Sequence, residues 1–332
     1  MSRCAARLAG ALLAWAVSPS AHGLDDATNA EGEMGGLLQT SMDFKLGHKA
    51  GQRDLVLMHI PFNFGHTVEA VAMLGTGQPG WDEYMESVGA AALVGRHASW
   101  AEVRLRAMWH PGAEIWGHAN PDLQVLSEVT GCPMFYTPPK HWPVELAQKY
   151  FGNKTVFGLL RDPYERLVAF FRGNIPGYGP THSEYVPTCD VNMAVKKTLQ
   201  DYLAGRMDDP SCSLLPQAEH FEGQYGIKLP VNLREFPRSM NQVLREHGYP
   251  EDFQIHAGDV RHVTDCPNVW AADLDAETRG LVQQIYAKDF ELLCKHFGYC
   301  NREENCCLYQ VEQMCPQRVL DLGYRGHEMP GM

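Results

Sequence analysis

The hydrophobic pattern of this chain alternates between short apolar runs and segments of helical period, which predicts an α/β fold. Residues 55–58 and 155–160 are uninterrupted apolar runs of strand length, as is typical of buried strands. Each run is followed by a short turn and then by apolar residues at helical spacing, from Thr67 to Met73 and from Pro163 onward. The pattern therefore predicts two strand–turn–helix units.

Further helices are predicted along the rest of the chain. The helical patterns cover residues 122–129, 191–203 and 237–247, and Asp275 caps one long helix that reaches Phe297 and is stopped by Gly298. Residues 24–50 are polar and Gly-rich without a clear period, which indicates a flexible stem.

The first turn has the composition of an anion site. Pro61 ends the strand, and a strand–turn–helix geometry aims backbone N–H groups and the helix dipole at a negative charge. An ordinary strand-to-helix turn explains the same stretch without any ligand. The residues that would form the site are Pro61, Phe62, Asn63, Phe64, Gly65, His66 and Thr67.

The second turn begins with Arg161 at the end of the apolar run. Asp162 is a natural N-cap, and Pro163 suits the first helical position. A well-capped core helix accounts for most residues of this segment. Arg161 is the exception, because a guanidinium just before a helix N-terminus can fork onto a phosphate.

Composition limits the class and the compartment. The chain has 332 residues, 45% of them hydrophobic, which is enough for a sizeable core. A net charge of -12 argues against a nucleic-acid partner. Residues 1–23 combine two arginines, an apolar stretch and small residues, which predicts a cleaved signal peptide; an uncleaved signal anchor is the alternative, and membrane association follows only in that case.

Ten cysteines suit an oxidising compartment. We expect Cys294 to be the unpaired, buried one and Cys189 to pair with Cys212 around a helical insert. The cysteines that would hold the C-terminal tail are Cys300, Cys306, Cys307 and Cys315. Zinc is the rival interpretation, but no C-x-x-C pair occurs, so no metal is expected. Asn153 opens one glycosylation sequon that is useful only if exposed.

Both turns resemble motifs of the carbohydrate sulfotransferases of the secretory pathway, and in particular the heparan-sulfate 2-O-sulfotransferase-like group. That family's donor loop reads roughly H-x-P-K-T-G-G-T-S, and the matching residues here are His59, Pro61, Gly65 and Thr67. Phe62, Asn63 and Phe64 stand in place of its Lys, Thr and first Gly. In the motif R-D-P-x-x-R-x-x-S-x-Y the matching residues are Arg161, Asp162, Pro163 and Arg166, and Ala169 replaces the Ser. A closing Y-x-x-D-F and G-Y are matched by Tyr286, Asp289, Phe290, Gly298 and Tyr299.

The resemblance implies a P-loop-NTPase-like three-layer fold, with a central parallel sheet flanked by helices, over residues 51–300, followed by a Cys-rich tail, 301–332. It implies 3′-phosphoadenosine 5′-phosphosulfate as the donor, with Arg161 at the 3′-phosphate and residues 62–67 at the phosphosulfate. The acceptor would be a glycan hydroxyl. Tyr136 stands where the family often has its catalytic histidine, so His118 and His141 are the candidate bases. His66 or Lys140 would supply the charge that Phe62 lacks.

Two versions of this function stay open, both in the Golgi lumen or after secretion. In one, the chain is a working sulfotransferase. In the other, it is a catalytically impaired sulfotransferase-like domain that binds a nucleotide or a glycan, since Phe62, Ala169 and Tyr136 all fall on functional positions. A glycosyltransferase or P-loop kinase of similar topology is a third class, but no G-x-x-x-x-G-K-[ST] sequence supports it.

Overall fold

A parallel sheet of three strands lies at the centre of the described structure, a computed structural model. The strands lie in the order β1 (Leu55–Leu57), β2 (Thr155–Leu160) and β3 (Leu229–Asn232). Phe157 pairs with Leu57 on one side and with Leu229 on the other. The structure describes residues 53–74, 117, 123–172, 183–206, 212–249, 251–260, 266–301, 307–308 and 310–321. The predicted α/β class is confirmed, and β3 is a strand that the hydrophobic pattern did not predict.

Helices follow each of the first two strands, as predicted. The described helices are α1 (Gly65–Leu74), α4 (Val144–Tyr150), α5 (Pro163–Arg172), α6 (Val191–Leu203), α7 (Arg238–Glu246), α8 (Ala276–Ile285), α9 (Ala287–Phe297) and α10 (Gln317–Asp321). Helix α1 begins two residues before the predicted Thr67, because Thr67 and Val68 both donate backbone N–H groups to the Phe64 carbonyl. The predicted bounds of α6 are confirmed, and those of α7 agree to within one residue at each end.

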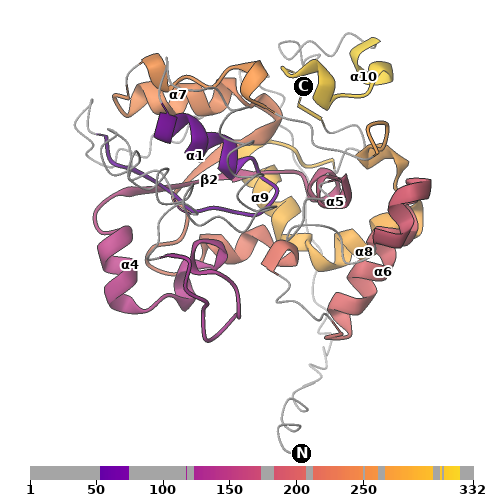
Figure 1. Cartoon of the computed structure of the whole chain (residues 1–332), viewed down its shortest axis with the longest axis horizontal. Coiled ribbons are helices and arrows are strands. Elements are labelled where there is room, and N and C mark those ends of the chain that lie inside the picture. The colour runs from indigo at the N-terminus through magenta and orange to yellow at the C-terminus, as the bar shows by residue number, and fades with distance from the viewer. Residues whose placement is uncertain are drawn as a thin grey trace, which may run out of the picture. The chain divides into compact units, whose positions relative to one another are not determined.

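The sheet is covered on both faces. Alternate strand residues such as Leu57 and Phe157 pack with α1 and α7, which lie together beside β2 in Figure 1. The other alternation, with Val56 and Val156, packs against the segment 123–151 that contains α4. Since side chains of a strand alternate between faces, strands that are apolar throughout require cover on both sides.

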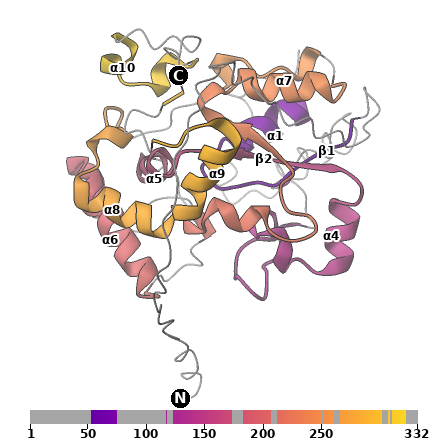
Figure 2. The ribbon, with the colours of Figure 1, turned by 180° about the vertical axis from the view of Figure 1, so that it is seen from behind.

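A third cluster of buried residues joins the helices α5, α6, α8 and α9. Leu167, Val195 and Phe290 are among its members, and Figure 2 shows α6 and α8 side by side. The prediction of one helix from Asp275 to Phe297 is wrong, since Tyr286 interrupts it with φ −107° and ψ 27°. The Tyr286 side chain is buried, and its hydroxyl donates to the Leu214 carbonyl, so a tertiary contact accompanies the break.

The segment before α4 is irregular. The prediction of a helix over 122–129 is wrong for the described part, residues 123–129, where Leu126 instead forms an antiparallel bridge with Pro133. Ser127 accepts from the N–H groups of Val129 and Thr130, a side-chain-to-backbone pattern that competes with helix formation.

Four disulfides join cysteines in the described part of the chain, and they fit an oxidising, secretory environment. The pairs are Cys132–Cys212, Cys189–Cys266, Cys294–Cys300 and Cys307–Cys315. The prediction of an unpaired Cys294 is wrong, because Gly298 ends α9 in the left-handed region, at φ 76°, and returns the chain so that Cys300 meets Cys294.

The predicted Cys189–Cys212 pair is also wrong. Cys189 packs against the cluster of α5, α6, α8 and α9 that holds Cys266, whereas Cys212 lies with Cys132 in the cluster beside the segment 123–151. Each cysteine instead finds a partner from another part of the chain, at a Cα distance of 5.6 Å in both cases.

The C-terminal segment contributes to the core around the sheet. Leu308, Val311 and Met314 are buried in the same cluster as β1 and α7. Asn153 is exposed in the turn before β2, so the sequon meets its structural condition. Among the described helices, none has the length and apolar character needed to cross a bilayer.

Candidate functional site

The turn between β1 and α1 has an unusual backbone. Phe62 and Phe64 have φ angles of 65° and 58°, a region that non-glycine residues rarely adopt. The Phe64 ring stacks on Phe236 with centroids 5.6 Å apart, and the Phe62 ring meets the edge of Phe170 at 5.2 Å. Packing of both rings therefore holds the turn in this shape.

Arg161 is committed to contacts inside the protein. Its side chain is only 3% exposed, and Nε and Nη2 donate to Glu165 Oε2 at 2.9 and 2.7 Å. Nη1 donates to the Phe62 carbonyl at 2.5 Å, and the guanidinium carbon lies 5.1 Å from the centre of the Phe64 ring. The residue that was expected at a 3′-phosphate thus links the second turn to the first.

Arg166 makes a second link between the turns. Its Nε donates to the Pro61 carbonyl at 3.1 Å, while Nη1 and Nη2 donate to the carbonyls of Leu215 and Ser213, both at 2.9 Å. Burial lowers the pKa of Arg166, whereas the nearby Tyr286 and Asp289 act in the opposite direction. Ala169, at the position of the family serine, lies half-buried on α5.

A buried amide and a buried carboxylate complete the link. Gln217 exchanges hydrogen bonds with the Arg161 backbone and accepts from Asn63 Nδ2 at 2.6 Å. Asp289 accepts from the N–H groups of Gln217 and Ala218, at 3.0 and 2.8 Å. Asn63 also donates to the Leu159 carbonyl, so its side chain points into the protein and is not presented to a ligand.

Two histidines and a glutamate gather beside the first turn. His59 Nδ1 lies 2.9 Å from Glu69 Oε1, and His66 Nδ1 lies 3.5 Å from Glu69 Oε2. The Glu69 side chain is fully buried, whereas that of His66 is 35% exposed. A Cβ on Gly65 would come within 2.5 Å of His59 Nε2, so a side chain at this position would displace the imidazole.

Tyr136 joins this cluster from another segment. Its hydroxyl lies 3.2 Å from His66 Nε2, and its ring meets the edge of His59 at 5.1 Å. The Tyr136 carbonyl accepts from His220 Nε2 at 3.2 Å, and burial lowers the His220 pKa to about 4, against hydrogen bonds that raise it. Tyr136 is therefore positioned through both its backbone and its side chain.

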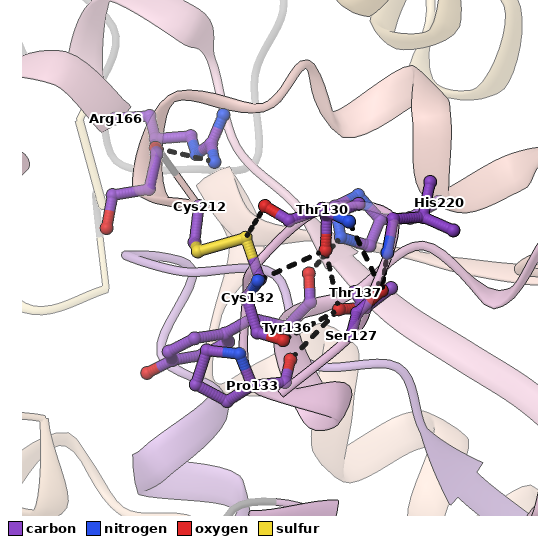
Figure 3. The surroundings of a disulfide bond; sticks show 11 residues. Ser127, Thr130, Cys132, Pro133, Tyr136, Thr137, Arg166, Cys212 and His220 are labelled. Carbon is purple, nitrogen blue, oxygen red and sulfur yellow. Dashed lines mark hydrogen bonds between the residues drawn. A yellow bond between two sulfur atoms is a disulfide. The ribbon is translucent and has the colours of Figure 1, made fainter. Parts of the chain in front are cut away.

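A disulfide anchors the segment that carries Tyr136. Figure 3 shows the Cys132–Cys212 bond beside Tyr136, Arg166 and His220. Thr137 Oγ1 lies 3.3 Å from the Cys132 carbonyl and 3.1 Å from the Pro133 carbonyl. The disulfide and these hydrogen bonds thus fix residues 132–137, which belong to no long helix or strand.

The other predicted residues differ in where they lie. His118 falls outside the described residues. His141 ends a 3₁₀ helix at Pro139–His141 and takes no part in the hydrogen bonds described for His59, His66, Glu69 and Tyr136. Lys140 lies 2.5 Å from Glu219 and 2.7 Å from Glu222, so its charge is already paired. Thr67 and Gly65 lie in the first turn of α1, with Thr67 buried.

Glu69 and Gln217 are site residues that the sequence did not predict. The signal for Glu69 was its spacing, since His66-x-x-Glu69 puts both side chains on one face of α1. No family model, curated protein or solved structure matches this chain. The site therefore has to be interpreted from its own geometry.

Proposed function

We propose that this chain is a divergent sulfotransferase with a P-loop-NTPase-like domain, and that it transfers a sulfuryl group from 3′-phosphoadenosine 5′-phosphosulfate to a hydroxyl of a glycan. The single observation that carries the proposal is the direct contact between the two turns, Arg161 Nη1 to the Phe62 carbonyl and Arg166 Nε to the Pro61 carbonyl. A donor with phosphate at both ends needs two such turns side by side, at the carboxyl ends of neighbouring parallel strands.

The acceptor chemistry is assigned to the pair His66 and Tyr136. Sulfuryl transfer resembles phosphoryl transfer, where positioning and charge stabilisation supply most of the catalysis. An imidazole that is oriented by a carboxylate and partly open to solvent suits removal of a hydroxyl proton, and His66 has Glu69 on one side and Tyr136 on the other. This assignment replaces His141 with His66, whose ring nitrogens lie 3.5 Å from Glu69 Oε2 and 3.2 Å from the Tyr136 hydroxyl.

A second candidate is the catalytically impaired domain that binds a nucleotide or glycan. The observation in its favour is that all three guanidinium nitrogens of Arg161 already have partners within the protein. Phe62 also supplies no positive charge at the position of the family lysine. Under this candidate, the same two turns bind a ligand without transferring sulfate.

Binding of adenosine 3′,5′-bisphosphate tests both candidates. Ligand at about 100-fold over its dissociation constant stabilises a protein by about 2.7 kcal/mol, which raises the melting temperature by several degrees. Arg161→Lys keeps a positive charge beside Glu165, but an ammonium cannot contact Glu165 and the Phe62 carbonyl as the guanidinium does. The ligand-induced rise in melting temperature should therefore be smaller in this variant. A surface variant, Arg206→Ala, is the matched control, since its ion pair with Asp201 is exposed.

Transfer of labelled sulfate to a glycan panel then separates the candidates. Ligand binding with transfer supports the enzyme, and binding without transfer supports the impaired domain. The absence of any shift at millimolar ligand would reject both. The secreted protein with its disulfides intact is the material for each assay.

A further inference from the structure

We propose that His59, His66 and Glu69 form a binding site for a divalent transition-metal ion, with zinc as the first candidate. One ligand atom from each residue lies within 4.8 Å of the others, although the sequence carried no cysteine motif for a metal. The site is argued from this cluster alone and does not rest on sulfuryl transfer. An ion on His66 Nδ1, with the Tyr136 hydroxyl at Nε2, leaves no nitrogen to accept a proton, so ion binding and the role of His66 as a base are alternatives.

The separation of the side chains fits a bridging ion. His66 Nδ1 and Glu69 Oε2 are 3.5 Å apart, beyond the usual range of about 2.7–3.2 Å for a hydrogen bond. Zinc binds histidine nitrogen and carboxylate oxygen at about 2.0–2.2 Å, and two such bonds span 3.5 Å at a nearly tetrahedral angle. The helix fixes this spacing, because residues three apart share one face of α1.

The cluster has the supporting contacts that metal ligands need. The Gly117 N–H donates to Glu69 Oε1 at 2.9 Å and fixes the carboxylate. The second ring nitrogen of His66 meets the Tyr136 hydroxyl, which would orient the ring while Nδ1 faces the ion. The lack of a side chain on Gly65 makes room for His59. Metal-binding histidines generally bond a partner through their other nitrogen in this way.

Charge and access also favour a cation. The Glu69 carboxylate is fully buried; its Oε1 already meets His59 Nδ1 and the Gly117 N–H, while its Oε2 faces the partly exposed His66. A divalent ion between Oε2 and His66 Nδ1 would add positive charge beside this buried carboxylate. His66 is 35% exposed, so the ion could exchange with solvent and keep one position for water. Two histidines and one carboxylate with an open position are a known zinc ligand set.

Zinc titration of the full secreted chain tests the proposal. The protein is stripped with a chelator, its disulfides are kept intact and any free thiol is alkylated, so that cysteine cannot bind the ion. We expect one zinc per chain by calorimetry, and His66→Ala should weaken binding by more than the roughly 10–100-fold that outer contacts cost. His256→Ala, which removes an exposed histidine of a different segment, should bind as the original chain does.

Two further variants separate ligation from damage to the fold. Glu69→Gln should lower affinity as strongly as His66→Ala, and Tyr136→Phe should lower it by about 10-fold through the orientation of His66. Cobalt in place of zinc should give a visible absorption band that His66→Ala abolishes. Circular dichroism of each stripped variant establishes that it is folded.

Two results would overturn the site. Failure of the stripped, folded chain to take up zinc at micromolar free metal would leave only a hydrogen-bonded cluster. Equal uptake by the original chain and His66→Ala would mean an adventitious ion elsewhere. The assays contain no nucleotide, so a negative result for adenosine bisphosphate leaves them unaffected.

Discussion

The turns at the ends of β1 and β2 both join a parallel strand to a helix, but their polar side chains differ in exposure and in the groups they contact. At the end of β2, Arg161 and Arg166 are buried and every contact they make is inside the protein. At the end of β1, His66 is partly open to solvent and shares a cluster with Tyr136 and Glu69. The comparison indicates that the two arginines of the second turn hold the first turn in place, whereas the first turn leaves His66 partly open to solvent.

The physical reason lies in the geometry of a parallel sheet. Neighbouring strands end at the same edge, so the turns after them lie together. The first turn holds two phenylalanines at positive φ, a conformation that persists only when its surroundings enforce it. The carbonyls of Pro61 and Phe62 accept from the two arginines, and these hydrogen bonds act together with the packing of the two phenylalanine rings to enforce it.

Removal of Arg161 should produce the largest effect. Arg161→Ala leaves the buried Glu165 without its closest partner, and breaking a buried ion pair costs about 3–5 kcal/mol. Urea denaturation of the intact protein measures the free energy of unfolding. Arg206→Ala, in an exposed pair with Asp201, is the control and should cost less than about 1 kcal/mol. Similar losses in the two variants would contradict the assigned role of the second turn.

Acid should produce the next largest loss of stability, through His220, which donates to the Tyr136 carbonyl. Burial lowers the pKa of His220 to about 4, from an ordinary value near 6.5. Below pH 6.5, His220 binds a proton in the unfolded chain but not in the folded protein. The contribution of His220 to stability is therefore constant above that pH and is lost as the pH falls toward 4. The loss approaches about 3 kcal/mol.

The control for this prediction is His220→Gln, which keeps an N–H donor for the Tyr136 carbonyl and does not titrate. Unfolding free energies of both proteins are measured from pH 7.5 to about pH 4. The difference between the two curves isolates His220 from the carboxylates that titrate in the same range. Parallel curves would show that this histidine does not remain neutral in the fold.

A side chain at Gly65 tests the close packing of the first turn. Gly65→Ala would place a Cβ 2.5–2.7 Å from the His59 ring and should destabilise the protein by about 1–3 kcal/mol. Gly280→Ala in α8 is the matched change, since nothing lies within 4 Å of the added Cβ. That variant should gain up to about 1 kcal/mol from helix propensity. A neutral Gly65→Ala would mean that His59 has room to move.

Loss of the Tyr136 hydroxyl should have the smallest effect on stability. Tyr136→Phe removes one partly buried contact to His66 Nε2, worth about 0.5–1.5 kcal/mol. Thermal unfolding measures the change, and NMR of the His66 ring reports its orientation. An unchanged His66 signal would show that Tyr136 does not position it, and would reduce the contrast between the two turns.

Local sequence signals predicted most of what is local in this structure. Asp162 accepts from the Tyr164 N–H and Asp275 from the Thr278 N–H, as expected of N-caps. Strand β2 has the predicted bounds, and Gly298 ends α9 as expected. Each of these features depends on residues within a few positions of one another, so composition and spacing are sufficient to predict it.

Contacts between distant segments were predicted poorly. Two disulfides close 80 and 77 residues of sequence, and the partners of those cysteines cannot be read from spacing. Tyr286 interrupts a helix whose local pattern is continuous, in a cluster formed by α5, α6, α8 and α9. In the cluster beside the first turn, the spacing of His66 and Glu69 is local and helical. Tyr136 lies 70 residues from His66 in the chain, so no local signal indicates that contact.

The sequence by itself determined the two strand–turn–helix units, the caps and the apolar faces, because these follow from residues close along the chain. Only the tertiary structure decided where the charges go. Whether Arg161 meets the Phe62 carbonyl, and whether His66 stands alone or beside Tyr136, depends on which segments the sheet and the disulfides bring together. Both contacts join residues 70 or more positions apart in the chain, so local sequence patterns do not encode them.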